Sequence, residues 1–213
     1  MAITQLYADL RTAIGRGSSV DANLPGWCQE AISELERDAF YKWMEKTATV
    51  TASPGPAGNV LSIPNVQIAA VDFVRTVRSQ GTNGTTYGPA LTPCTAFDIL
   101  SVDEGMDAQG FYFDGVSNIV LDAIPGAATD FQIRYWEYTQ WPTDVGATPP
   151  ILARHYAGTK AIAMMTAARN LRDARLAEVW NVAFTSAKQG MWIADGIDGR
   201  SGMKHRRGMA QRG

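Results

Sequence analysis

The chain contains few of the residues that carry most enzyme chemistry. It has only two histidines, His155 and His205, and two cysteines, Cys28 and Cys94, among 213 residues. Neither histidine has a Cys, His or Glu at the spacing of a metal site, which argues against a metal centre. The cysteines lie far apart without a CxxC pair, which favours reduced thiols and a cytosolic origin. We therefore expect a protein without a metal, a cofactor or an enzymatic activity.

Long apolar runs are absent as well. No stretch reaches the roughly 18 apolar residues of a membrane span, so no contact with a membrane is expected. The N-terminus lacks the basic, apolar and small-residue order of a signal peptide, so none is expected either. Residues 1–195 carry 14 Lys+Arg against 20 Asp+Glu, whereas residues 196–213 carry five against one. An acidic body followed by a basic tail indicates that the tail has a role of its own.

Apolar residues recur at helical spacing near both ends of the chain. Ile3, Leu6, Leu10 and Ile14 form one stripe of a short helix, which Gly15 ends. A second amphipathic helix and a long helical stretch after two prolines follow the same period. The predicted helices cover residues 3–14, 24–46 and 149–195, the last with a joint near residues 170–173.

Between these helices, residues 47–140 are typical of a small antiparallel β unit. Short β-branched runs alternate with Gly/Pro turns, and residues 131–138 alternate as a half-buried strand should. Strands in the middle and helices at both ends predict an α+β fold, in which the terminal helices pack as a bundle around the β unit. We expect one domain over residues 1–195 and a basic C-terminal arm over residues 196–213. Residues 80–89, polar and glycine-rich, are predicted to form a mobile surface loop.

The long C-terminal helical stretch carries more apolar surface than a small monomer normally buries. Residues 176–191 repeat apolar side chains at helical spacing, and residues 151–165 form a broad, Ala-rich apolar surface. Such a pair of helices needs a partner surface, either in its own domain or on another subunit. The residues expected to pack there are Ile151, Leu152, Tyr156, Leu176, Trp180 and Phe184.

Three features invite a chemical interpretation. Asp103, Glu104 and Asp107 are close enough in sequence for an acid/base pair or a cation site, but solvated loop carboxylates are the favoured interpretation. The glycine-rich run in the tail resembles a phosphate loop, yet Met203 stands where the lysine is needed and no strand precedes the run. His155, on an apolar helix, is expected to be partly buried and hydrogen-bonded.

An aromatic stretch supports an alternative function. Tyr135, Trp136, Tyr138 and Trp141 could stack against sugars or bases in a carbohydrate- or nucleic-acid-binding module. Alternation places Tyr135 on the opposite side from Trp136 and Tyr138, so the platform is partial at best. Core packing and interface burial are the favoured interpretation of these rings.

The basic arm has three interpretations. Its cations could contact the phosphates of a nucleic acid. They could equally be solvated charges on a flexible terminus. As a third possibility, the arm orders against an acidic partner protein.

The order of these parts along the chain resembles that of a known protein family. An N-terminal helix pair is followed by strand-like residues 119–125 and 131–136, then by Pro150-Ile151-Leu152 opening a helix, and by Trp180 with Phe184 in the final helix. Over residues 3–190 this layout resembles the head-to-tail adaptor (connector) proteins of tailed bacteriophages, and is similar to the tail tubular adaptors of short-tailed phages. Residues 80–89 and the tail after 196 are not part of the similarity.

The resemblance implies a virion structural protein at the head-tail junction, assembled in the host bacterial cytoplasm. Related adaptors form a ring, a dodecamer, that binds under the portal protein, extends the DNA channel and docks the next tail or nozzle protein. Genomic DNA would pass through the lumen without specific binding, and we expect a lumen without a Lys/Arg lining, which would retard DNA. The C-terminal segment reaches the portal in similar proteins. This implies portal contacts for Arg200, Lys204, His205, Arg206, Arg207 and Arg212.

Overall fold

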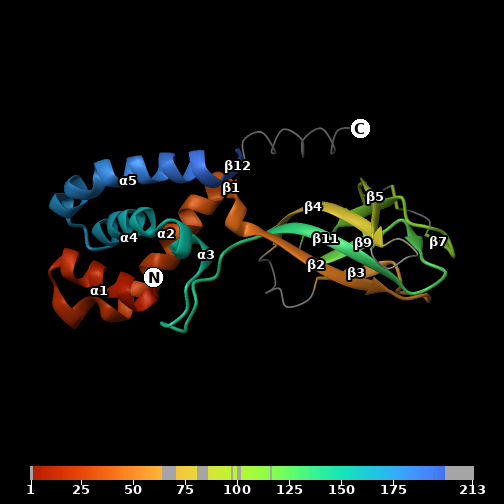
Figure 1. Ribbon diagram of the computed structural model, residues 1–213, viewed down its shortest axis with the longest axis horizontal. Helices are drawn as coiled ribbons and strands as arrows, with labels where there is room; N and C mark the ends of the chain where they lie inside the picture. Colours follow the sequence, from red (N-terminus) through yellow and green to blue (C-terminus); the bar gives the residue numbers. More distant parts are fainter. Residues whose placement is uncertain are drawn as a thin grey trace. The chain divides into compact units, whose positions relative to one another are not determined.

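The computed structural model describes residues 2–63, 71–80, 86–96, 98–99, 102–115 and 117–199. The predicted α+β fold is confirmed, because helices lie at both ends of the sequence and strands lie in its middle (Figure 1). The described chain divides into two compact units. We call residues 2–43 and 139–199 the helical unit, and residues 44–138 the β unit. The five Lys and Arg residues and His205 assigned to the portal-contacting arm, between Arg200 and Arg212, lie outside the described residues.

The first helix follows its apolar stripe closely. Helix α1 (Ile3–Ile14) buries Ile3, Leu6 and Leu10, and it ends at Gly15, whose φ of 71° is left-handed. Helix α2 (Leu24–Asp38) begins with a proline in its first turn and buries one face. It ends at Asp38 rather than near residue 46.

The shorter α2 has a tertiary cause. Residues Ala39–Tyr41 form strand β1, which pairs antiparallel with β12 (Gly196–Gly199) from the far end of the chain. A short 3-10 turn, Lys42–Met44, follows. Phe40 and Trp43, which fall within the helix predicted for residues 24–46, are buried from a strand and a turn instead, because pairing with a distant segment overrides the local helical period.

The C-terminal helical stretch is three helices. They are α3 (Pro150–Arg154), α4 (Tyr156–Asn170) and α5 (Ala174–Asp195). Helix α4 is buried on nearly all sides, since it packs against α1, α2, α3 and α5 (Figure 1). Its Ala, Met and Ile side chains suit a helix surrounded by other helices. Leu171–Asp173 turn the chain back into α5, with Arg172 at a left-handed φ of 52°.

The β unit contains two main sheets. One has the order β2-β11-β4-β5, formed by Glu45–Ala52, Thr129–Glu137, Val71–Gln80 and Tyr87–Ala90, all antiparallel. The other has the order β3-β9-β8-β6, formed by Val60–Ser62, Asn118–Leu121, Gly110–Phe113 and Thr92–Pro93.

The β unit is mainly antiparallel, as predicted, with two short parallel pairings. Strand β6 pairs parallel with β8, and the small β7 (Asp103–Glu104) pairs parallel with β10 (Ala123–Ile124). Strand β5 also takes residues 87–89 out of the predicted surface loop, and residues 81–85 of that loop lie outside the described chain.

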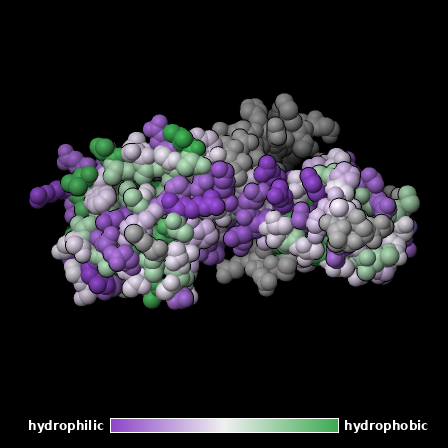
Figure 2. All heavy atoms as spheres, viewed as in Figure 1, coloured by the Kyte–Doolittle hydropathy of each residue, from purple (hydrophilic) through white to green (hydrophobic). Residues whose placement is uncertain are grey.

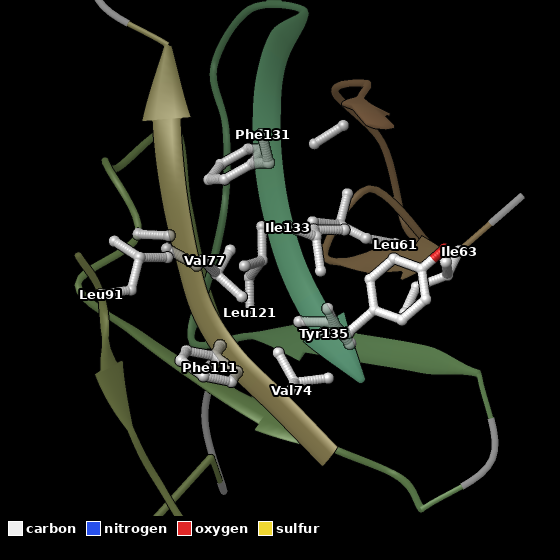
Figure 3. Close-up of a cluster of buried hydrophobic side chains, with 14 residues drawn as sticks. Leu61, Ile63, Val74, Val77, Leu91, Phe111, Leu121, Phe131, Ile133 and Tyr135 are labelled. Atoms are coloured by element: carbon white, nitrogen blue, oxygen red, sulfur yellow. The ribbon is translucent and has the colours of Figure 1, made fainter. Parts of the chain in front are cut away.

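A hydrophobic core lies between the two sheets (Figure 3). Phe131, Ile133 and Tyr135 point inward from β11, as their alternation predicts, and meet Leu61 and Leu121 of the other sheet. Burying each such side chain stabilises the fold by about 1.5–3 kcal/mol relative to exposure. The opposite face of the β2-β11-β4 sheet therefore carries the polar residues of the same strands.

Candidate functional site

Helix α5 is the element whose surface the fold uses least. Its principal contact is with α4, and of its 22 residues only Met191 and Asp195 are buried. The side turned away from α4 faces solvent, because no other described element covers it. Figure 2 shows hydrophobic side chains gathered along this helix.

The solvent-facing side of α5 carries a stripe of apolar and small residues. Val179, Val182 and Ile193 are 67%, 78% and 73% exposed. Ser186 and Gly190 lie between them on the same helical face, and a side chain added at Gly190 would meet no atom within 4 Å. We call these five residues the α5 stripe. A solvent-facing helix side normally carries charged residues, so this stripe is unusual for a surface that remains wet.

A shallow apolar groove adjoins the stripe within the helical unit. It is lined by Ala39 and Tyr41 of β1 and by Phe184 and Trp192 of α5, and its volume is about 420 Å³. Trp192 is 40% exposed, and none of the five stripe residues lines the groove. On the rim, Lys188 donates a hydrogen bond to Asp38 at 2.5 Å.

The ends of α5 are held by charge and hydrogen bonds. At its start the Asp173 side chain accepts from the Leu176 amide at 3.0 Å, the capping arrangement that satisfies a free N–H of the first turn. At its end the Asp195 carboxylate is only 7% exposed. It accepts a hydrogen bond from His155 Nε2 at 2.6 Å, and Arg154 and Lys42 approach it at 3.4 and 3.8 Å.

The surroundings of Asp195 favour the ionised form of its carboxylate. Burial alone would raise its pKa, but the hydrogen bond from His155 and the charges of Arg154, His155 and Lys42 outweigh burial and lower the pKa below its ordinary value. Because a carboxylate only accepts, His155 Nε2 carries the proton of this bond. The network fixes the point at which the chain leaves α5 and enters β12.

His155 is hydrogen-bonded and partly buried, as the sequence predicts. A histidine paired with a buried carboxylate also occurs in nucleophilic enzymes, where its second nitrogen meets a hydroxyl or thiol. Here the ring packs edge-on against Trp43, with ring centroids 5.7 Å apart, and Trp43 in turn stacks on Tyr41. The surroundings of His155 therefore fit a structural clamp.

The six predicted packing residues fall into two groups. Ile151 and Leu152 are each 1% exposed, so the single chain already covers them. Tyr156 is half-buried and donates from its hydroxyl to Asp9 at 3.0 Å. The remaining three, Leu176, Trp180 and Phe184, are half-buried on the flanks of α5. Their role between subunits stays a prediction.

Sequence periodicity did not identify the most exposed part of α5. The apolar face predicted for residues 176–191 includes Val179, which instead lies on the solvent side. Val182, Ser186 and Ile193 were not assigned to any surface. A signal was available, because residues 179–187 contain no charged side chain, whereas a helix with one solvent-facing side usually does.

The aromatic stretch does not form an exposed stacking platform. Tyr135, Trp136 and Trp141 are 5%, 1% and 9% exposed. Tyr135 belongs to the core of the β unit, and Trp141 donates through its ring nitrogen to Tyr7 at 2.7 Å in the helical unit. These three rings are therefore packing residues, Tyr138 is half-buried, and the alternative binding function stays a prediction.

The acidic residues and cysteines considered as candidates do not have the surroundings of reactive groups either. Glu104 and Asp107 are exposed to solvent. Burial raises the pKa of Cys28 to about 12, and burial with nearby Asp122 and Asp98 raises the pKa of Cys94, so neither thiol is activated. In the described ranges, no group of three or more His, Cys, Asp or Glu side chains is placed to hold a metal ion. No helix of the described chain has the length and apolar character needed to cross a membrane.

Comparison with known proteins gives no family assignment. No protein-family model matches the chain, and no curated protein sequence is detectably similar to it.

Proposed function

We propose that this chain is a structural assembly subunit, a head-to-tail adaptor of a tailed bacteriophage that forms a ring under the portal and extends the DNA channel toward the tail. The α5 stripe is the observation that carries the proposal. It offers an uncovered apolar face on a long, well-anchored helix, which suits contact with an identical neighbouring copy.

The energetics favour a covered stripe. Val179, Val182 and Ile193 expose most of their side chains in the single chain. Covering each of them stabilises an interface by about 1–2 kcal/mol. Ser186 and Gly190 allow a neighbouring element to approach the helix backbone closely, because neither has a long side chain. An interface between two different faces of identical subunits closes into a ring when the rotation between neighbours is suitable.

The adaptor role itself is supported by the order of parts. An N-terminal helix pair, a β unit and a C-terminal helix hairpin follow each other as in the connector proteins that the sequence resembles. The five Lys and Arg residues of the basic arm, residues 196–213, all follow β12, which ends at Gly199. In the proposed ring the arm's cations contact the portal, the next tail or nozzle protein docks on the opposite side, and genomic DNA passes through the lumen.

Native mass spectrometry and negative-stain electron microscopy of the purified chain, alone and with portal protein, test this proposal. Wild type should form a closed ring at the portal, with a dodecamer as the expected copy number. Val182→Lys with Ile193→Lys should abolish ring formation while leaving the melting temperature of the free chain nearly unchanged, because both positions are exposed. Truncation after Gly199 should keep the ring and weaken its attachment to the portal.

A matched control uses exposed apolar residues elsewhere. Met106 and Val145 are 59% and 50% exposed and lie outside α5. Met106→Lys with Val145→Lys should therefore assemble as wild type does. A wild-type chain that stays monomeric beside its portal, or that forms only a two-fold dimer, would refute the proposal.

A further inference from the structure

The β2-β11-β4 sheet contains all the cations of the β unit. Residues 44–138 contain ten Asp+Glu but only four Lys+Arg. All four cations, Lys46, Arg75, Arg78 and Arg134, lie on the three neighbouring strands of this one sheet (Figure 1). The same three strands also carry four carboxylates, Glu45, Asp72, Asp130 and Glu137, so they are balanced in charge, and the acidic excess of the β unit lies outside them.

The register of the strands places two of these arginines next to each other. Arg134 of β11 lies between Thr47 of β2 and Thr76 of β4, and Arg78 lies in the next row of the same face. Residues diagonal to each other across an antiparallel pair are about 7–8 Å apart, within reach of long side chains. Two rows of three hydrogen-bonding residues result, and we call them the arginine–threonine face: Thr47, Arg134 and Thr76, then Thr49, Gln132 and Arg78.

These two rows contain no carboxylate, and Asp130 lies in the next row of the same face, diagonal to Arg78. Both Arg78 and Arg134 are exposed, and in the described chain neither forms an ion pair. Two carboxylates flank these rows: Glu45 pairs with Arg75 at 3.3 Å, and Asp130 accepts a hydrogen bond from the Thr51 hydroxyl at 2.5 Å. Arg75 also lies over the buried Trp136 ring, 5.5 Å from its centroid. Arg75 is therefore held by contacts within the sheet, whereas Arg78 and Arg134 form no ion pair in the described chain and can bind a ligand.

From this arrangement we infer that the arginine–threonine face binds the phosphodiester backbone of a nucleic acid. Guanidinium groups recognise phosphate oxygens with charge and paired donors. Threonine hydroxyls and the Gln132 amide add the neutral donors that commonly accompany arginine at a nucleic-acid backbone.

The inference goes beyond the proposed assembly role and does not depend on it, since binding is measured on the free chain. It also differs from the expectation, made from the sequence, that the DNA channel of the ring has no lining of Lys or Arg. The contact would be independent of base sequence, because backbone contacts position a nucleic acid without reading its bases.

Fluorescence anisotropy with a labelled short DNA duplex, over a range of salt concentrations, tests the inference. Each phosphate contact adds about 0.9 to the slope of log affinity against log salt. Arg78→Gln with Arg134→Gln should reduce the slope by about 2, so that wild type loses about tenfold more affinity than the variant between roughly 50 and 200 mM salt. Thr47→Val with Thr76→Val should weaken binding severalfold at one salt concentration and leave the slope unchanged, because these contacts carry no charge.

The control removes equal charge from another place. Arg37 and Arg175 are exposed residues of the helical unit, and Arg37→Gln with Arg175→Gln should keep the wild-type slope. The tail after Gly199, with its five Lys+Arg, is the same in every variant, so its contribution cancels. Equal slopes for the two arginine double variants, or no DNA binding by wild type, would overturn the inference. Displacement of DNA by polyglutamate at equal charge concentration would assign the face to an acidic protein instead and would overturn it as well.

Discussion

Replacing Asp195 by asparagine should destabilise the helical unit by about 2–3 kcal/mol, the value of a buried hydrogen bond to a charged group. The magnitude follows from the unequal burial of its partners. The side chain of His155 is only 18% exposed, whereas those of Arg154 and Lys42 are 54% and 55% exposed. The His155 bond at 2.6 Å therefore supplies most of the stabilisation, and the two exposed cations contribute less than about 1 kcal/mol each.

Thermal unfolding followed by tryptophan fluorescence reports mainly on the helical unit, which contains Asp195. For a chain of this length, 1 kcal/mol corresponds to about 2–4 °C, so the melting temperature should fall by about 4–12 °C. Trp136 is in the β unit, and the other five of the six tryptophans are in the helical unit. They are Trp27, Trp43, Trp141, Trp180 and Trp192.

The pH dependence gives a second test of the same network. The pKa of Asp195 is lowered in the folded protein, so its carboxylate binds protons less readily there than in the unfolded chain. Its stabilisation is therefore fully present above the unfolded pKa of about 3.9 and is lost as the pH falls through the lower folded pKa. Wild type and Asp195→Asn should differ by a constant amount at mildly acidic to neutral pH and converge in stronger acid.

The exposed partners provide the control for Asp195. Lys42→Gln and Arg154→Gln should each cost less than about 1 kcal/mol, because both cations are more than half exposed. If Asp195→Asn costs no more than these variants, or if the difference persists unchanged in strong acid, then the buried carboxylate does not anchor the end of α5.

Two further predictions concern single positions. Gly190→Ala should raise the free energy of unfolding by about 0.5–1 kcal/mol, because alanine favours the helix and the added methyl group meets no atom within 4 Å; a lower melting temperature would show that this side of α5 is covered in the free chain. Cys28, whose pKa burial raises to about 12, should resist iodoacetamide at mildly alkaline pH until urea unfolds the helical unit; its modification in the folded chain would contradict its burial.

Periodicity predicted the parts of the fold in which one face is buried. Ile3, Leu6 and Leu10 are buried as their spacing requires, and Phe131, Ile133 and Tyr135 alternate into the core of the β unit. These predictions succeed because the position of a side chain around a helix or strand depends only on the local backbone. The same principle could not identify Ala39–Tyr41 as a strand, since β1 exists through its pairing with residues 196–199.

The candidate site was only partly accessible to sequence reasoning. The excess apolar surface of the C-terminal helices and the basic charge of residues 196–213 follow from composition and period alone. Tertiary structure decided which side of α5 faces solvent, because that depends on α4 covering the opposite side. It also decided that His155 meets Asp195 and that Arg78 lies diagonal to Arg134. Both arrangements join residues at least 40 positions apart, and only chain packing and strand register bring such residues together.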